Sequence, residues 1–230
     1  MPQRIIHLVR HGQIDPTRSV PEPQGWGLTA LGREQAVLTA QRLTQLPIAY
    51  IHHSTAPRAV ETAEILAAHL PGVSCHPSPL LVECAAYVPP AFREWYLRTR
   101  IEPPDQDKRD IPAVMRPWLN LWSHHVDLAA VDAGAAQAEQ AFAHYFRAAG
   151  TMVQHEVVVS HCALLAYLVC RVLHIPPDLW IHLEMDNCGI SEVRIDATGQ
   201  CRLLSFNDVG HLPYAMRTSN EQRMEWFGGT

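Results

Sequence analysis

Arginine and histidine side chains follow three apolar, strand-like runs of this sequence. Arg10 and His11 come directly after RIIHLV, and His161 comes directly after EVVVS. A third run, IAYIHHS, leads within a few residues to Arg58. Ligands of parallel α/β sheets bind beyond the carboxyl ends of the strands, so we expect these four side chains to share one edge of a sheet.

Two arginines and two histidines in one place favour phosphate chemistry. Guanidinium groups bind phosphate oxygens in pairs and keep their charge, and nearby helix N-termini add backbone N–H donors. An imidazole, whose ordinary pKa is about 6.5, is a nucleophile near neutral pH and can attack phosphorus to form a phosphohistidine. Such a transfer also needs a carboxylic acid that protonates the leaving oxygen. Taken alone, His161 is equally consistent with a hydrogen-bonded histidine at the end of a core strand.

The elements that must hold these groups alternate between strands and helices. Continuous aliphatic runs predict strands covered on both faces, and apolar residues spaced by three and four predict helices. Thr29 suits the N-cap of the first helix, and Pro57 suits the first turn of the second. This alternation predicts a three-layer α/β/α fold with a mostly parallel central sheet. The predicted strands are 4–9, 48–54 and 156–160, the helices are 28–46, 57–70, 138–150 and 161–174, and 188–196 with 201–206 form a hairpin.

Residues 84–134 interrupt this rhythm with many prolines and three tryptophans. A long insertion of this kind in a compact domain often covers a substrate site. We therefore expect one domain over residues 1–230, with a substrate-cap insertion at about 84–134. A surface elaboration with aromatic packing is the alternative.

The composition narrows the class of protein and its surroundings. A net charge of −5 gives no reason to expect nucleic-acid binding, so an anionic substrate needs a local basic pocket. The six cysteines include no CxxC pair, and we expect them to be mostly reduced core residues. The histidine pairs 52–53 and 124–125 point apart on a strand or a helix, so we expect no metal and no cofactor. No run is long enough to span a membrane, and we expect a soluble, intracellular, more cytoplasmic than mitochondrial protein.

Four motifs in order, LVRHG, LTALGREQA, STAPRAVET and VVVSHCALL, resemble the histidine phosphatase superfamily and its phosphoglycerate mutase-like fold. The resemblance implies that His11 is the nucleophile and that Arg10 and Arg58 clamp the phosphate. It implies that His161 binds the transferring phosphoryl group as a hydrogen-bond donor. Glu83, in PLLVE, matches the position of the proton donor.

Two other carboxylates are alternatives to Glu83 as the proton donor. They are Glu61 and Glu94, because the family places this donor on a variable loop. We expect Glu61 to be structural instead, since it lies on the helix that carries Arg58.

The resemblance also narrows the choice within the superfamily. Mutases usually carry a Trp-Asn pair shortly after RHG, whereas this chain reads RHGQIDPTRS, which favours a phosphatase over a phosphoglycerate mutase. The C-terminal half resembles the branch of mitochondrial phosphoglycerate mutase-like serine/threonine protein phosphatases. That branch normally has a membrane anchor and a multimerisation segment, which this sequence lacks, so a large assembly is not expected and a homo-oligomer stays open.

Three functions follow from these observations. The first is a metal-independent phosphomonoester hydrolase that acts on phosphoserine or phosphothreonine in proteins. Arg93, Arg98 and Arg100 could then contact a phosphopeptide or a second phosphate, and a solvated charged face is the alternative for these three arginines. The second is a phosphatase of sugar phosphates or other small metabolites. The third is a non-catalytic phosphate-binding module, suggested by Cys162 where the superfamily commonly has glycine. A thiol at a helix N-terminus beside arginines is also open to oxidation, which would reduce activity.

Overall fold

The computed structural model describes residues 2–14, 27–84, 93, 128–150 and 152–218. A six-stranded sheet in the order β3-β2-β4-β1-β5-β6 forms its centre. Strands β3, β2, β4 and β1 are parallel to one another, whereas β5 is antiparallel to β1 and β6 is antiparallel to β5. The strands are β1 Gln3–Arg10, β2 Ile48–Ser54, β3 Ser74–Ser78, β4 Val153–Ser160, β5 Ile190–Asp196 and β6 Cys201–Asp208.

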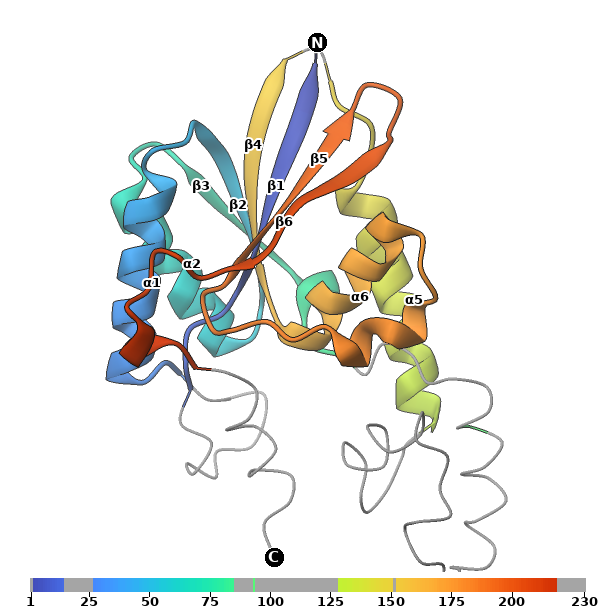
Figure 1. Ribbon diagram of the computed structural model, residues 1–230, viewed down its shortest axis with the longest axis horizontal. Helices are drawn as coiled ribbons and strands as arrows, with labels where there is room; N and C mark the ends of the chain where they lie inside the picture. Colours follow the sequence, from blue (N-terminus) through green and yellow to red (C-terminus); the bar gives the residue numbers. More distant parts are fainter. Residues whose placement is uncertain (1, 15–26, 85–92, 94–127, 151, 219–230) are drawn as a thin grey trace, which may run out of the picture.

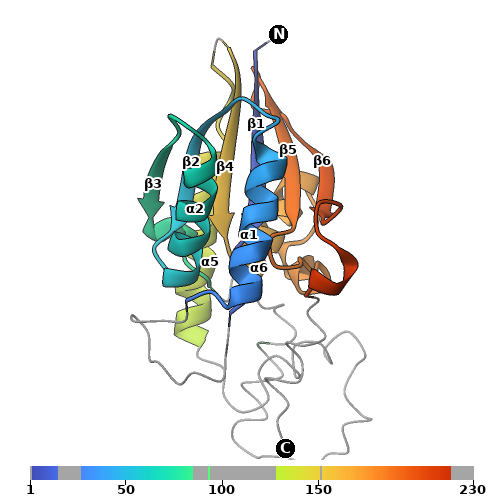
Figure 2. The same cartoon turned by 90° about the vertical axis from the view of Figure 1, so that its left-hand side faces the viewer.

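Four α-helices cover the two faces of this sheet. Figures 1 and 2 show α1 and α2 on one face and α5 and α6 on the other, which makes three layers. The predicted α/β/α fold with a mostly parallel sheet is therefore confirmed. The helices are α1 Ala30–Leu43, α2 Pro57–His69, α5 Leu128–Tyr145 and α6 Cys162–Leu173, with short 3-10 turns η1 Pro79–Leu81, η4 Pro177–His182 and η5 Tyr214–Met216.

The core explains why the central strands read as continuous apolar runs. Ile6 and Leu8 of β1 pack with the α5 and α6 layer, and Val9 packs with the α1 and α2 layer. All three side chains are fully buried. Successive side chains of a strand point to opposite faces, so a strand covered on both sides needs apolar residues at every position.

Most predicted elements are found close to their expected limits. The Thr29 side chain caps α1 by accepting from the Gly32 backbone N–H at 2.9 Å, and Pro57 lies in the first turn of α2, both as predicted. Strand β3 was not predicted, because it has only five residues and contains Pro77, which is tolerated at the edge of a sheet.

The boundaries of α5 differ from the prediction. This helix begins at Leu128 and not at 138, so residues 128–134 of the expected insertion belong to it. Gly134, which lies inside the helix, lowers the helical propensity there and obscures the pattern. Residues 85–92 and 94–127, which make up most of the expected cap, lie outside the described residues. In the part of the chain that the structure describes, no helix is long and apolar enough to cross a membrane.

Candidate active site

The carboxyl ends of β1, β2 and β4 bring the two histidines together. Arg10 and Ser160 are the last residues of neighbouring strands and are paired in register. His11 and His161 follow them directly, and their ring centroids lie 5.1 Å apart at an interplanar angle of 60°. Both side chains are buried, with 2% and 0% exposure. The juxtaposition expected from the sequence is therefore present.

His11 has the protonation state that a nucleophile needs. Its Nδ1 lies 2.8 Å from the Gly12 carbonyl oxygen, which can only accept, so Nδ1 carries the proton and Nε2 keeps its lone pair. Burial is the main reason that the pKa of His11 lies well below 6.5. Repulsion from His161 when that ring is protonated, and from the charges of Arg10 and Arg58, also lowers it, against a smaller opposite effect of the Gly12 carbonyl. The imidazole is therefore neutral at neutral pH.

Gly12 lets the loop after β1 touch helix α1. A Cβ on Gly12 would lie 2.4 Å from the Gly32 carbonyl oxygen, which is closer than any side chain tolerates. The Gly12 N–H donates to Thr62 Oγ1 at 3.1 Å, and Thr62 Oγ1 donates to the Arg58 carbonyl at 2.7 Å. Asn187 Nδ2 donates to the His11 carbonyl at 2.8 Å from the opposite side. These contacts hold the His11 backbone in place.

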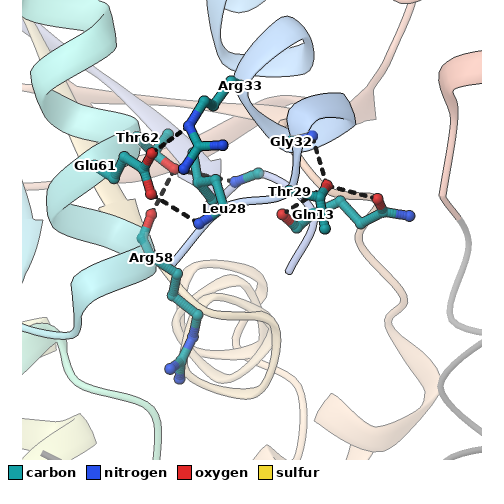
Figure 3. A network of polar contacts seen from close by, with 9 residues as sticks. Gln13, Leu28, Thr29, Gly32, Arg33, Arg58, Glu61 and Thr62 are labelled. Carbon is teal, nitrogen blue, oxygen red and sulfur yellow. Dashed lines mark hydrogen bonds and ion pairs between the residues drawn. The ribbon is translucent and has the colours of Figure 1, made fainter. Parts of the chain in front are cut away.

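Glu61 of α2 binds the segment around the start of α1, and its contacts are with Leu28 and Arg33 and not with the histidines. Its carboxylate accepts from the Leu28 N–H at 2.8 Å and from Arg33 Nε at 2.5 Å (Figure 3). In the same view the Arg58 side chain extends away from this network. These contacts support the structural role expected for Glu61.

His161 is held at both ring nitrogens. Arg58, in the first turn of α2, donates from Nε to His161 Nδ1 at 3.2 Å. His161 Nε2 lies 2.8 Å from Ser54 Oγ. Because a guanidinium only donates, Nδ1 is an acceptor in this arrangement and the ring proton is on Nε2. The sequence predicted His161 as a donor to a phosphoryl group, and in this structure both of its ring nitrogens contact protein side chains.

Arg10 and Glu83 approach the histidines from the α5 and α6 side. Arg10 is 4% exposed and donates from Nη1 to the Met185 carbonyl. Glu83 follows η1, and its Oε1 accepts from the Leu164 N–H at 3.2 Å, in the first turn of α6. His161 is the N-cap of that helix, so the carboxylate lies at the same helix end as the second histidine.

The other candidates from the sequence have different outcomes. Cys162 opens α6 and is only 5% exposed, so burial limits the access of peroxide to its thiol. Arg93 forms an ion pair with Asp132 of α5, with nitrogen–oxygen distances of 2.6 and 2.8 Å. Glu94, Arg98 and Arg100 lie outside the described residues. All six cysteines are described, and none forms a disulfide.

Three residues at this edge were not predicted from the sequence. They are Ser54, Thr62 and Asn187, each of which is polar and buried. Ser54 and Thr62 flank Arg58 within the motif STAPRAVET, so their position beside a recognised arginine was a usable signal. Asn187 comes from a distant loop, and nothing in its own surroundings distinguishes it.

A hollow of about 560 Å³ lies at the opposite end of the strands. It includes Arg4, His52, His76, Tyr145 and Glu156 and none of the residues around His11. Among the described residues no group of three or more His, Cys, Asp or Glu side chains is arranged to hold a metal ion. The chemistry expected from the sequence therefore collects at the carboxyl edge and not in this hollow.

Sequence comparison finds relatives along most of the chain. The mouse (Mus musculus) and human (Homo sapiens) proteins named serine/threonine-protein phosphatase PGAM5, mitochondrial, are 33% and 32% identical over 213 residues. Each comparison covers 91% of this chain and 64% of the relative, so the chain spans less than two thirds of the length of these relatives. Both relatives are named mitochondrial, which does not fit the cytoplasmic placement expected from the sequence.

Solved structures share the fold. The alpha-ribazole phosphatase of Shigella flexneri has a TM-score of 0.62 at 21% identity, with 89% of this chain and 96% of that chain covered. Phosphoglycerate mutase of Plasmodium falciparum has a TM-score of 0.56 at 23% identity, with 93% and 96% covered. At this level of identity the likeness concerns the fold, and it confirms the phosphoglycerate mutase-like architecture.

The family follows from the sequence match together with this geometry. The sequence profile of the histidine phosphatase superfamily (branch 1) matches residues 6–209, which include all four motifs. The resemblance drawn from those motifs is thereby confirmed. The chain belongs to the histidine phosphatase superfamily.

Proposed function

We propose that this protein hydrolyses phosphomonoesters through a phosphohistidine formed on His11. The observation that supports this most is the pair of buried imidazoles 5.1 Å apart, with Arg10 and Arg58 beside them. A neutral nucleophile next to two permanent positive charges suits the transfer of a phosphoryl group, whose catalysis is mostly positioning and electrostatics.

The proposed reaction has two displacements. His11 Nε2 attacks phosphorus and forms a P–N bond while the bond from phosphorus to the ester oxygen breaks. Glu83, in its acid form, gives its proton to the leaving oxygen. A water molecule then attacks phosphorus, Glu83 takes one of its protons, and the P–N bond breaks to release phosphate. Nδ1 keeps its proton on the Gly12 carbonyl throughout, so His11 returns to its starting state.

Binding requires a change at Arg58. Its Nε is bonded to His161 Nδ1, and a phosphoryl group between the histidines would compete for that guanidinium. The charge of Arg10 is already in place, because the backbone carbonyl of Met185 orients its guanidinium. We therefore expect the Arg58 guanidinium to move when a phosphoryl group binds, whereas the Arg10 guanidinium is already in its binding position.

Phosphoserine or phosphothreonine in proteins is the substrate class we infer. The support is the name of relatives that are 32–33% identical over 91% of the chain. We also infer that the segment after Glu83 forms a substrate cap within a single domain over residues 1–230. The support is the position of Glu83 at the N-terminus of α6, beside the proposed active site, because the inferred cap begins directly after it.

A substrate panel tests the proposal directly. We expect turnover of a phosphothreonine peptide, and His11→Ala should lower the rate by roughly 10³-fold or more, as for other covalent nucleophiles. His76→Ala is the matched control and should leave the rate unchanged, since this exposed histidine of edge strand β3 lines the hollow that includes none of the residues around His11.

The same panel separates the competing functions. If the protein strongly prefers one sugar phosphate over the peptide, its substrate is a small metabolite and not a phosphoprotein. Tight phosphate binding with no turnover of any member would mean a non-catalytic phosphate-binding module. Full activity of His11→Ala would reject His11 as the nucleophile.

A further inference from the structure

Ser54 is the last residue of β2 and contacts the second histidine of the site. Its side chain is fully buried, and its Oγ lies 2.8 Å from His161 Nε2. The same oxygen accepts from the Ala56 N–H at 3.1 Å, one residue before α2 begins. One hydroxyl thus joins the end of β2, the start of the helix that carries Arg58, and the ring of His161.

We propose that Ser54 is the positioning residue that keeps His161 Nδ1 turned toward the phosphoryl site and supports its change from acceptor to donor. This inference rests on the proposed phosphatase function. Ser54 itself touches no reacting atom, because it lies on the Nε2 side of the ring, opposite the nitrogen that Arg58 contacts.

The reason lies in the hydrogen bonds of the two states. Without substrate, Nδ1 accepts from Arg58, the proton is on Nε2, and Nε2 donates to Ser54 Oγ. When Arg58 turns to a phosphoryl group, Nδ1 loses that donor. To bind a phosphoryl oxygen, Nδ1 must gain a proton. The monoanion of the phosphomonoester supplies it and becomes the dianion, and His161 becomes an imidazolium.

The Ser54 oxygen suits both states because it accepts from Nε2 in each of them. When His161 becomes an imidazolium, Nε2 keeps its proton and still donates to Ser54 Oγ. When the phosphate product takes the Nδ1 proton away, Nε2 again keeps its proton and its bond to Ser54 Oγ. The Ala56 N–H holds the oxygen in position in either case, so His161 never leaves a buried polar nitrogen without a partner.

Among the described residues, the other buried hydroxyls at this edge of the sheet are not available to replace Ser54. His161 has 0% exposure, so water does not reach the ring freely. The other buried hydroxyls at this edge are committed: Ser160 Oγ donates to the Leu81 carbonyl at 2.8 Å, and Thr62 Oγ1 joins Gly12 to Arg58. Loss of the Ser54 hydroxyl would let the His161 ring rotate, and a misplacement of about 1 Å can cost 10²-fold in rate.

Nitrogen NMR of the histidine side chains tests this in the wild-type protein. In the absence of phosphate, His161 should be protonated at Nε2 and bare at Nδ1. Added vanadate, which mimics the transferring group, should produce a protonated Nδ1. A protonated Nδ1 in the phosphate-free protein, or no change with vanadate, would overturn the proposed switch, and neither reading depends on a variant that folds.

Ser54 variants test the link to catalysis. Ser54→Ala should lower kcat by roughly 10- to 100-fold with a smaller change in KM, because orientation matters most in the transition state. It should also give a mixture of His161 tautomers. Ser54→Thr keeps the hydroxyl and should recover both the rate and the tautomer. Should Ser54→Ala not fold, Ser54→Cys keeps the side-chain size with a much weaker hydrogen bond and should show the same loss.

Ser191→Ala is the matched control. Ser191 is equally buried, and its Oγ accepts one backbone N–H, that of Asn207 at 2.9 Å, on strand β5. It should leave both kcat and the His161 tautomer unchanged. A folded Ser54→Ala with wild-type kcat and tautomer would reject the role of Ser54. If wild type turns over no phosphomonoester, the proposed function fails instead, and the NMR measurement still decides how His161 is held.

Discussion

His11 and His161 meet edge to face, but their hydrogen bonds leave them in opposite tautomers. His11 holds its proton on Nδ1 through the Gly12 carbonyl, and His161 holds its proton on Nε2 beside Ser54. Two neutral rings therefore lie side by side between two arginines without adding positive charge. The one with a bare Nε2 is ready to attack, and the other is ready to be protonated.

The activity should persist at pH values below the ordinary pKa of histidine. Burial and the nearby positive charges lower the pKa of His11 well below 6.5, so its nucleophilic form is kept as the solution becomes more acidic. We expect the acidic limb of kcat/KM to fall well below pH 6.5. A pH–rate profile with an aryl phosphate measures this, and an acidic limb centred at 6.5 would contradict the neutral, buried state of His11.

Replacing Glu83 by glutamine should slow the release of poor leaving groups. Glu83→Gln keeps an oxygen that accepts from the Leu164 N–H but removes the acid. We expect the rate on a phosphothreonine peptide to fall by roughly 10²- to 10⁴-fold. The rate of the variant on an aryl phosphate should fall much less, because an aryl leaving group needs less protonation. Equal losses on both substrates would show that Glu83 is not the donor, and Glu61→Gln, which alters only the Leu28 and Arg33 contacts, should not change the ratio.

Gly12→Ala should damage both stability and activity. The added Cβ would meet the Gly32 carbonyl at 2.4 Å, and two backbone segments would have to separate. Overpacking of this kind costs about 1–3 kcal/mol in the free energy of unfolding. Urea denaturation measures the loss. Gly150→Ala is the control, because nothing lies within 4 Å of a Cβ there, and equal stability of the two variants would argue against the close approach.

Stability should fall as the pH drops from about 6.5 toward 4 because of His7. Burial, as the larger cause, and the charge of His155 together lower the pKa of His7 to about 4. His7 Nε2 lies 3.1 Å from His155 Nδ1. The unfolded chain therefore takes up a proton at a higher pH than the folded one. The full loss is about 3 kcal/mol, and it is complete only below the folded pKa. Urea titrations at several pH values measure the free energy of unfolding. It should change less with pH for His7→Asn than for the wild type, and an identical pH dependence of the two would contradict the assignment.

Removal of divalent metals should leave the rate unchanged. The proposed reaction uses imidazole, guanidinium and carboxyl groups, and each of its steps balances without a metal ion. We expect equal turnover before and after treatment with EDTA, with vanadate as an inhibitor in both samples. A loss of activity in EDTA that added zinc or magnesium restores would contradict the mechanism.

Much of the fold could be read from periodicity. The aliphatic runs that became β1, β2 and β4 are buried on both faces, so packing and pattern agree there. Strand β3 was not predicted, because five residues that include a proline show almost no periodicity. Its conformation depends on its pairing with β2. The start of α5 was misplaced because Gly134 weakens a local signal that packing on the sheet overrides.

The sequence by itself determined which groups we propose for the chemistry: two arginines, two histidines and a carboxylate, each attached to a recognisable motif. Only the tertiary structure decided how they act on one another. Hydrogen-bond direction assigns the His11 and His161 tautomers, and it depends on Gly12, Ser54 and Arg58, which come from different elements. Proton positions are set by burial and by partners distant in sequence, and no local pattern of residues encodes them.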